Sequence, residues 1–231
     1  GGGALPPGQV VEEAAASRCH SIAYTYTEPT IFFEYAHDTA MLARERGLRN
    51  IFVTNGYMTD KTVEAAAPWL DAANVDLKSW QEKYYRESCM GRLKPVLNTI
   101  RKMKEMGIWV EITTLLIPGE NDFPEDLQGI ASFIADLDVD IPWHISAFHP
   151  SYQYMDRRPA EIGSLEEARR IGREAGLRYI YLGNVPADNN TICPNCGKAV
   201  IERKGWLIEQ AGLQEGGQCG ACRTMIAGVW K

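Results

Sequence analysis

Short apolar runs recur along the first 185 or so residues, and each is followed by a longer stretch in which polar and apolar residues mix. The runs predict strands at residues 21–26, 50–54, 72–77, 109–117, 142–148 and 178–182. Most of them are apolar on both faces, as expected for parallel strands covered by helices. The amphipathic stretches between them predict helices at residues 29–46, 94–106, 124–137 and 164–175.

The ends of these helices carry recognisable signals. Gly47, Gly107 and Gly176 each follow a predicted helix directly, where a residue of left-handed conformation is expected. Ser164 and Glu167 have the spacing of a capping box. Alternating strands and helices predict an α/β fold with a parallel sheet, either a barrel or an open sheet. No glycine-rich phosphate fingerprint follows the first strand, so we favour a partial parallel (β/α) barrel.

Composition narrows the function classes. The chain has 231 residues, of which 45% are apolar and 23% charged, the usual mixture for a globular protein. It contains no apolar stretch long enough to span a membrane and no signal peptide, so we expect no membrane partner and a cytoplasmic location. The net charge of −6 argues against nucleic acid as the main ligand, although the tail from Asn190 onward is mildly basic.

Polar residues follow several of the predicted strands, where (β/α) barrels carry their chemistry. Glu28 follows the first strand and either grips an ammonium or hydroxyl group or caps the helix that begins at Pro29. Asn55 and Gly56, after the second strand, predict a tight turn that either offers backbone N–H groups to a ligand or serves only as a turn.

The later strands add three candidates. Asp76 and Lys78 share one face at the end of the third strand, where they form either a structural ion pair or a binding site. After the fifth strand, His149 is a better candidate for a ligand contact than His144, which lies inside the strand and suits a core position.

The strand-end motifs occur in a familiar order. Glu-Pro is followed by Thr-Asn-Gly, Asp-Leu-Lys, Pro-Gly with Asn-Asp, and an aromatic residue with His. Together they resemble the radical S-adenosylmethionine (SAM) enzymes, in the branch that is similar to pyruvate formate-lyase activating enzymes. With the Cys-Pro-Asn-Cys-Gly tail, they are most similar to the radical SAM member of the AmmeMemoRadiSam system. The resemblance extends from about Leu5 to Trp230.

This resemblance implies a partial barrel of the radical SAM type and an oxidoreductase that uses SAM and a [4Fe–4S] cluster. It implies that Glu28 contacts the amino group of SAM, and that Asn55 and Gly56 line the methionine and ribose region. Thr54 is expected among the cofactor-binding residues. The substrate, a small molecule or a protein, is left open.

The resemblance also assigns roles further along the chain. Asp76 and Lys78 would lie beneath the SAM carboxylate, and His149 near the adenine or ribose. The chain departs from the family pattern at two positions. Val53 stands where the branch often has an acidic residue, and Thr113 where it can have an arginine for the SAM carboxylate.

The cluster ligands that the family needs, three cysteines spaced C-x-x-x-C-x-x-C, do not occur in the sequence. Cys19 and Cys89 stand alone and are expected to be ordinary thiols. In the family the cluster loop precedes the helix that begins here near Pro7. Three explanations compete: a shortened chain, a gene read from too late a start, and a paralogue that lost its chemistry. We favour a fragment whose full-length form is the enzyme.

The tail contains two C-x-x-C pairs, Cys193 with Cys196 and Cys219 with Cys222. Two such pairs predict a tetrahedral S₄ site for zinc, or for iron as in rubredoxin, with zinc preferred. Residues 200–203 and 205–208 predict a short hairpin between the pairs. The chain therefore divides into a barrel at residues 1–187 and a zinc-ribbon or rubredoxin-like knuckle at residues 188–231.

The sequence is compatible with two functions. The first is a radical SAM enzyme that generates the 5′-deoxyadenosyl radical when its upstream segment is present. The alternative is a non-catalytic SAM- or nucleotide-binding barrel whose metal ribbon docks a partner protein or RNA. A barrel hydrolase or aldolase ranks last, because no nucleophile–base pair is evident.

Overall fold

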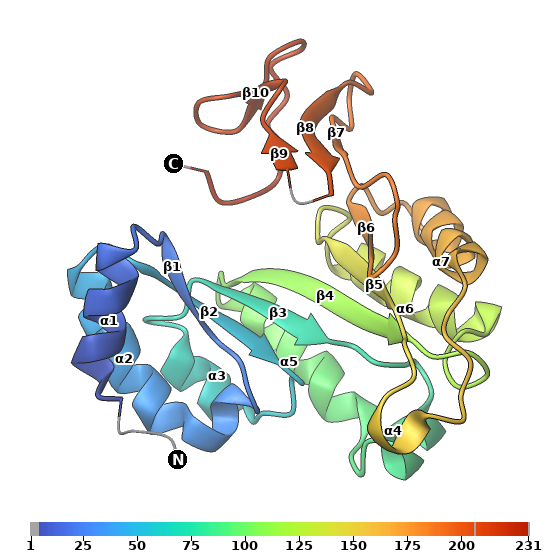
Figure 1. Ribbon diagram of the computed structural model, residues 1–231, viewed down its shortest axis with the longest axis horizontal. Helices are drawn as coiled ribbons and strands as arrows, with labels where there is room; N and C mark the ends of the chain where they lie inside the picture. The colour runs from blue at the N-terminus through green and yellow to red at the C-terminus, as the bar shows by residue number, and fades with distance from the viewer. Residues whose placement is uncertain (1–4, 206, 231) are drawn as a thin grey trace. The chain divides into compact units, whose positions relative to one another are not determined.

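The computed structural model describes residues 5–205 and 207–230 (Figure 1). Six strands form one sheet in the order β1-β2-β3-β4-β5-β6, in which each strand neighbours the one that follows it in sequence. Their bounds are β1 Ser21–Tyr24, β2 Arg49–Thr54, β3 Ala72–Asp76, β4 Trp109–Leu116, β5 Trp143–Ala147 and β6 Ile180–Gly183. The pairs β1–β2, β2–β3, β4–β5 and β5–β6 are all parallel. The predicted parallel α/β architecture is confirmed, with each predicted strand within two residues of its position.

The helices are α1 Pro7–Ala16, α2 Phe33–Glu45, α3 Asp60–Ala66, α4 Glu82–Glu87, α5 Leu93–Glu105, α6 Pro124–Leu137 and α7 Ile162–Glu174, with 3₁₀ turns η1 Pro29–Phe32 and η2 Tyr152–Tyr154. Gly47, Gly107 and Gly176 follow α2, α5 and α7 with φ of 72°, 80° and 99°, as predicted. The predicted capping box at Ser164 is wrong. The extended residue before α7 is Glu161, so Ser164 already lies in the first turn and donates its N–H to the Glu161 carbonyl.

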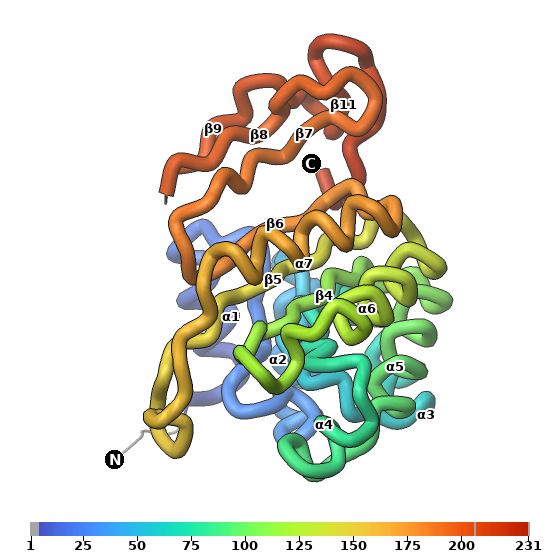
Figure 2. The backbone as a smooth tube through the Cα atoms, turned by 90° about the vertical axis from the view of Figure 1, so that its right-hand side faces the viewer, coloured from blue at the N-terminus to red at the C-terminus, as the bar shows by residue number. Residues whose placement is uncertain are grey.

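The chain packs as two compact units. Within the described residues, the first comprises 5–77 and 92–111, and the second comprises 78–91, 112–205 and 207–230. In the first unit α1 and α2 lie side by side (Figure 1), and in the second α6 and α7 do so (Figure 2). The division into 1–187 and 188–231 stays a prediction. Within the described residues, no helix combines the length and apolar character needed to cross a membrane.

A buried amide ties the first unit together. Asn50, on β2, is fully buried; its Oδ1 accepts a hydrogen bond from the Tyr24 hydroxyl at 3.0 Å. Its Nδ2 donates to the carbonyls of Ala40 and Trp69 at 3.3 and 3.2 Å. A buried polar group with every partner satisfied fixes the relative position of the elements that it joins, and this one joins β1, β2 and α2.

In the second unit β5 separates two kinds of surface. Trp143, Ile145 and Ala147 are fully buried, whereas the alternate residues His144 and Ser146 are only half-buried. Gly172 of α7 lets the helix approach, since a Cβ there would lie 3.1 Å from the Trp143 ring. His144 and Ser146 therefore face away from this helix.

The tail forms short antiparallel strands, which lie together in Figure 2: β7 Thr191–Ile192, β8 Ala199–Lys204, β9 Leu207–Glu209, β10 Leu213–Gln214 and β11 Gln218–Cys219. The predicted hairpin is confirmed as β8 and β9, although residue 206 of that prediction lies outside the described residues.

Candidate functional site

Glu28 joins the loops that follow β1 and β2. Its side chain is buried, and its Oε1 accepts hydrogen bonds from Thr54 Oγ1 at 2.6 Å and from the hydroxyl and backbone N–H of Thr30 at 3.2 and 3.4 Å. Its Oε2 accepts one bond, from the Asn55 backbone N–H at 2.8 Å. A carboxylate offers about four lone-pair sites, so Oε2 retains room for a further donor.

The cap interpretation of Glu28 is confirmed, whereas its role as a ligand contact stays a prediction. The bond from the Thr30 N–H makes Glu28 the N-cap of η1. The shorter bonds from Thr54 and Asn55 connect it to β2, which a local cap does not require. The carboxylate thus serves as a cap and also as an acceptor held in place at two strand ends.

In the Thr54–Tyr57 turn, backbone N–H groups are already hydrogen-bonded within the protein. Thr54 Oγ1 accepts from the Gly56 N–H at 3.1 Å, and Asn55 Oδ1 accepts from the Tyr57 N–H at 2.8 Å. With the Asn55 N–H bound to Glu28, the expectation that this turn offers free backbone N–H groups is wrong. Among the described residues the Asn55 amide nitrogen Nδ2 has no hydrogen-bond partner, and Asn55 is exposed. The side chain, not the backbone, is the donor available to a ligand.

Gly56 is required by both its conformation and its neighbours. Its φ is 69°, and a Cβ would lie 2.6 Å from Val75 Cγ1. We expect Gly56→Ala to lower the free energy of unfolding by about 2–5 kcal/mol, from left-handed strain and overpacking together. Gly47→Ala is the matched control, because Gly47 has φ 72° with open space around it and should cost only about 1–2 kcal/mol. Urea unfolding measures both values, and equal losses would contradict the steric part of this prediction.

Asp76 and Lys78 lie at the end of β3. The register between β2 and β3 pairs Thr54 with Val75. The next residues along the two strands, Asn55 and Asp76, therefore lie side by side in the first unit. Lys78 belongs to the second unit. Its backbone is fixed there, with its N–H donating to the Tyr85 hydroxyl at 3.1 Å and its carbonyl accepting from Asn121 Nδ2 at 2.5 Å.

His149 follows β5 in the second unit and is exposed. Its Nε2 lies 3.2 Å from the Asn184 carbonyl, and Asn184 Nδ2 donates to the Ala147 carbonyl at 3.1 Å. When Nε2 carries the proton in the neutral ring, Nδ1 remains an acceptor. His144 stacks on Tyr181 with ring centroids 5.4 Å apart.

The structure thus brings Glu28, Thr54, Asn55 and Gly56 into one hydrogen-bonded group, with Asp76 on the neighbouring strand of the same unit. Lys78 and His149 are on strand-end loops of the other unit.

The sequence motifs did not reveal the role of Asn121. This residue is fully buried, and its Oδ1 accepts from the Ile117 N–H at 2.7 Å while its Nδ2 donates to the carbonyls of Lys78 and Leu115. It therefore fastens the loop after β4 to the segment after β3. The Pro-Gly turn just before it, in the Pro118–Asp122 segment, was the available signal.

The four cysteines of the tail form a candidate metal centre. The Sγ atoms of Cys193, Cys196, Cys219 and Cys222 all lie within 4.8 Å of one another. Cys193 and Cys222 sulfurs are 3.5 Å apart, and Cys196 and Cys219 sulfurs 3.7 Å apart. Tetrahedral zinc with Zn–S of about 2.3 Å places sulfurs about 3.8 Å apart. The set fits a single tetrahedral ion.

The two knuckles share one backbone design. The N–H of Gly197 donates to the Cys193 carbonyl, and the N–H of Arg223 donates to the Cys219 carbonyl. Gly197 and Arg223 both have left-handed conformations, with φ of 71° and 63°. Each C-x-x-C pair therefore closes one turn, which directs both of its sulfurs to the same point.

Hydrogen bonds to the sulfurs favour the thiolates that a metal needs. Side-chain bonds from Thr224 and Asn195 hold the pKa of the Cys222 thiol at about 5. Backbone N–H groups of Ala221 and Cys222 lower the pKa of Cys219. The Lys198 N–H acts in the same direction on Cys196, but desolvation and the neighbouring sulfurs raise that pKa to about 11. A bound metal cation would stabilise the Cys196 thiolate through its positive charge.

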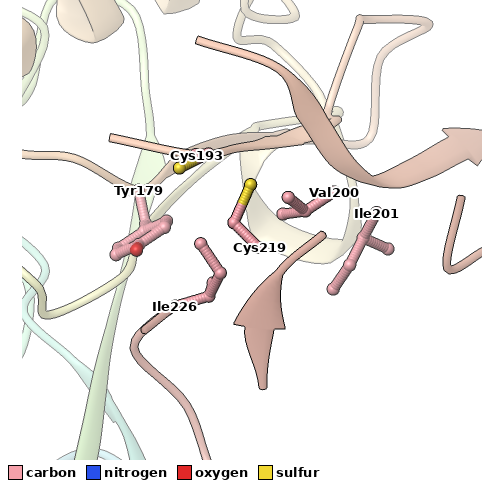
Figure 3. Packing of buried hydrophobic residues seen from close by; sticks show 6 residues of the cluster. All are labelled: Tyr179, Cys193, Val200, Ile201, Cys219 and Ile226. Atoms are coloured by element: carbon pink, nitrogen blue, oxygen red, sulfur yellow. The ribbon is translucent and has the colours of Figure 1, made fainter. Parts of the chain in front are cut away.

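The metal centre is embedded in a small apolar core (Figure 3). The sulfurs of Cys193 and Cys219 lie among Val200, Ile201 and Ile226, and Tyr179 from just before β6 completes the cluster. The Tyr179 hydroxyl accepts a hydrogen bond from the Ala227 N–H at 3.3 Å. The apolar core of the ribbon thus includes Tyr179, which comes before β6 in the chain.

The cysteines do not fit a radical SAM [4Fe–4S] cluster. Such a cluster takes three thiolates from one C-x-x-x-C-x-x-C loop, which the 231 residues do not contain. Cys19 is exposed, Cys89 is half-buried, and the other four form the single-ion set of the tail.

The chain is similar to several known proteins. The family described as the Radical SAM superfamily matches residues 1–134. An uncharacterized protein of Methanocaldococcus jannaschii is 44% identical over 202 residues, which cover 86% of the chain and 60% of that protein. An isethionate sulfite-lyase activating enzyme of Oleidesulfovibrio alaskensis is 26% identical over 121 residues, 50% of the chain and 39% of the enzyme.

Among solved structures, a domain of pyruvate-formate lyase-activating enzyme from Bacteroides vulgatus superimposes with a TM-score of 0.63 at 19% identity. The match covers 71% of the chain and 99% of that domain, and at this identity it shows a shared fold. The chain spans 60% or less of the length of the two curated relatives described above.

Proposed function

The chain belongs to the radical SAM superfamily, and from this premise we propose that it binds SAM at the carboxyl ends of its first strands. Glu28 would accept a hydrogen bond from the methionine ammonium. The observation that carries the proposal is the Glu28 carboxylate itself, which is buried, oriented by four donors, and left with capacity on Oε2. A charged group held in this way is suited to a cationic partner.

The remaining residues are proposed in supporting roles. The Asn55 side chain would donate to the ligand, and Gly56 would let the chain turn close to it. Asp76, beside Asn55 on the next strand, would contact the same ligand. Lys78 and His149 are proposed to contact the SAM carboxylate and the adenine or ribose. For these two the support is their position after β3 and β5 and the family resemblance.

For the longer protein we propose generation of the 5′-deoxyadenosyl radical, an oxidoreductase activity directed at a small-molecule or protein substrate. A [4Fe–4S] cluster would supply the electron, with ligands outside these 231 residues, so no step of that reaction is assigned to this chain. The residues of this chain would bind and orient SAM and limit the access of water.

Four finer assignments belong to the same proposal: the branch of the superfamily, the metal, the location and a partner. The Cys-Pro-Asn-Cys-Gly tail supports membership of the AmmeMemoRadiSam branch, with zinc as the ion of the S₄ site because it is the commoner structural occupant. Elemental analysis after expression without added metal distinguishes zinc from iron. The paired, unbridged thiols also support the cytoplasmic location, and the ribbon remains a candidate docking site for a partner protein.

Calorimetric titration with two ligands tests SAM binding. We expect SAM to bind the chain more tightly than methylthioadenosine, which keeps the nucleoside but lacks the ammonium and carboxylate. Asp76→Ala should weaken SAM more than methylthioadenosine, because Asp76 is proposed to lie beneath the SAM carboxylate, which methylthioadenosine lacks. Failure of SAM to bind, or equal affinities for the two compounds, would contradict the assignment of Glu28 to the ammonium.

A second experiment distinguishes a radical SAM enzyme from a non-catalytic SAM-binding module. We expect the full-length gene product, reconstituted anaerobically with iron and sulfide and then reduced, to release 5′-deoxyadenosine from SAM. Chromatography of the quenched reaction measures the product, and a sample without reductant is the control. A full-length protein that binds SAM but forms no 5′-deoxyadenosine would support the non-catalytic alternative.

A further inference from the structure

An open pocket of about 290 Å³ lies in the second unit, on the segments that follow β3 and β4. The residues that line it, here called the Trp80 pocket, are Trp80, Gln81, Phe123, Glu125 and Asp126. Pockets for whole ligands occupy roughly 300–1,000 Å³. The Trp80 pocket is at the lower limit, so it suits a group the size of one side chain.

The fold holds the Trp80 indole in a fixed position. Gly129 of α6 leaves the space that the indole fills, since a Cβ there would lie 2.2 Å from Trp80 Cδ1. The Phe133 ring supports the indole, with centroids 5.7 Å apart. A glycine inside a helix makes the helix less stable than an alanine would. At position 129 the glycine, by lacking a Cβ, leaves the room that the Trp80 indole occupies. Phe123, with 45% of its surface exposed, adds a second aromatic wall.

The pocket also has two acidic side chains in its lining, Glu125 and Asp126. Asp126 is buried, and its carboxylate accepts hydrogen bonds from Ser79 Oγ at 2.8 Å, from Gln81 Nε2 at 3.0 Å and from the Trp80 N–H. Glu125 is exposed and has no hydrogen bond or ion pair within the described residues. Among the residues that the structure describes, no lysine, arginine or histidine lines the pocket.

We propose that the Trp80 pocket binds the cationic end of a basic side chain, a lysine ammonium or an arginine guanidinium, presented by a polypeptide. Aromatic faces attract such cations through the ring quadrupole, and carboxylates pair with them. An anion would meet two carboxylates, and a neutral apolar group would make no use of Glu125. The pocket shares no residue with the proposed SAM site, so either proposal can fail without the other.

Nuclear magnetic resonance of the tryptophan indole N–H groups tests the pocket directly, with Trp80→Phe identifying the Trp80 signal. Nα-acetyl-lysine amide and Nα-acetyl-arginine amide should shift that signal in a saturable manner. The neutral analogue Nα-acetyl-norleucine amide should bind about tenfold more weakly, because it lacks the cation–π and charge contributions. Equal shifts with the neutral analogue, or no shift with either cation, would overturn the proposal.

A matched pair of variants tests the carboxylate. Glu125→Gln should weaken the lysine amide about two- to fivefold, as expected for an exposed charge pair. Glu12→Gln, which removes an exposed charge from α1, should leave the affinity unchanged. Unchanged binding in Glu125→Gln would contradict the assigned role of this residue.

The source of the cation is tested with a lysine-rich peptide and spermidine. When affinities are compared per positive charge, we expect the peptide to bind more tightly than spermidine. The reason is that a side chain on a peptide backbone suits a pocket of this volume. Tighter binding of spermidine would overturn the polypeptide as the source.

Discussion

Replacing Cys219 with serine is expected to abolish metal binding by the tail and to unfold the ribbon. Cys219 is buried between the sulfur cluster and the apolar core of the ribbon. Structural zinc contributes about 10–16 kcal/mol in zinc-finger peptides, which exceeds what this small core can supply by itself. Metal content should therefore fall from about one ion per chain to near zero, as measured by elemental analysis.

The same substitution should lower the stability of the second unit. Tyr179 is buried in the ribbon core, so loss of the ribbon exposes it and removes its bond from the Ala227 N–H. We expect the Tm to fall by roughly 5–10 °C, at about 2–4 °C per kcal/mol for a chain of this size. Cys19→Ser and Cys89→Ser are matched controls and should keep both metal and Tm. A Cys219→Ser protein that retains one tightly bound ion would contradict the S₄ site.

The second large effect is expected from Glu28→Gln in SAM binding. The substitution removes the charge and leaves one backbone donor of the cluster without an acceptor, since one carboxylate oxygen becomes an amide nitrogen. A hydrogen bond to a charged group contributes about 1.5–3 kcal/mol, so the SAM affinity should fall about 10- to 100-fold. Calorimetry provides the affinity, and thermal melting provides the accompanying loss of stability.

Methylthioadenosine separates a ligand contact from a general disturbance of the fold. If Glu28 binds the ammonium, Glu28→Gln weakens SAM and leaves methylthioadenosine nearly unchanged. Glu64→Gln is the matched control, because Glu64 is half exposed and pairs only at the surface with Lys102, at 2.8 Å. Equal losses for both ligands in Glu28→Gln would identify the carboxylate as purely structural.

Much of the fold could be predicted because its signals are local. Apolar runs of strand length and glycines of left-handed conformation are determined by neighbouring residues. Two short helices, α3 and α4, were not predicted, since seven and six residues are too few to show a clear period. The hydroxyl of Ser164 suggested that a helix begins there. Helix α7 instead begins earlier, at Ile162, so Glu161 is the residue that precedes its first turn.

In the candidate sites, too, local sequence signals could be recognised, whereas contacts between distant residues could not. The C-x-x-C pairs could be recognised from spacing alone, and the four sulfurs do converge. The contribution of Tyr179 to the ribbon core could not be foreseen, because it precedes the first knuckle by fourteen residues and carries no metal-binding signal. Likewise Asn121 and Asp126 act on partners more than forty residues away, a distance over which sequence periodicity gives no information.

Glu28 illustrates why neither local interpretation was complete. Sequence spacing indicated a helix cap or a ligand contact as alternatives. The fold brings Thr54 and Asn55 to the carboxylate from 26 and 27 residues away, so the cap also becomes part of a group spanning two strands. Parallel pairing of β1 with β2 produces this proximity, because it aligns their carboxyl ends.

A crystal structure of the chain with SAM would show whether the ligand binds at the ends of β1 and β2. We expect the methionine ammonium at hydrogen-bonding distance from Glu28 Oε2, about 2.7–3.2 Å, with the Asn55 amide beside the same ligand. SAM bound away from the ends of β1 and β2, or an ammonium paired with another carboxylate, would contradict this expectation.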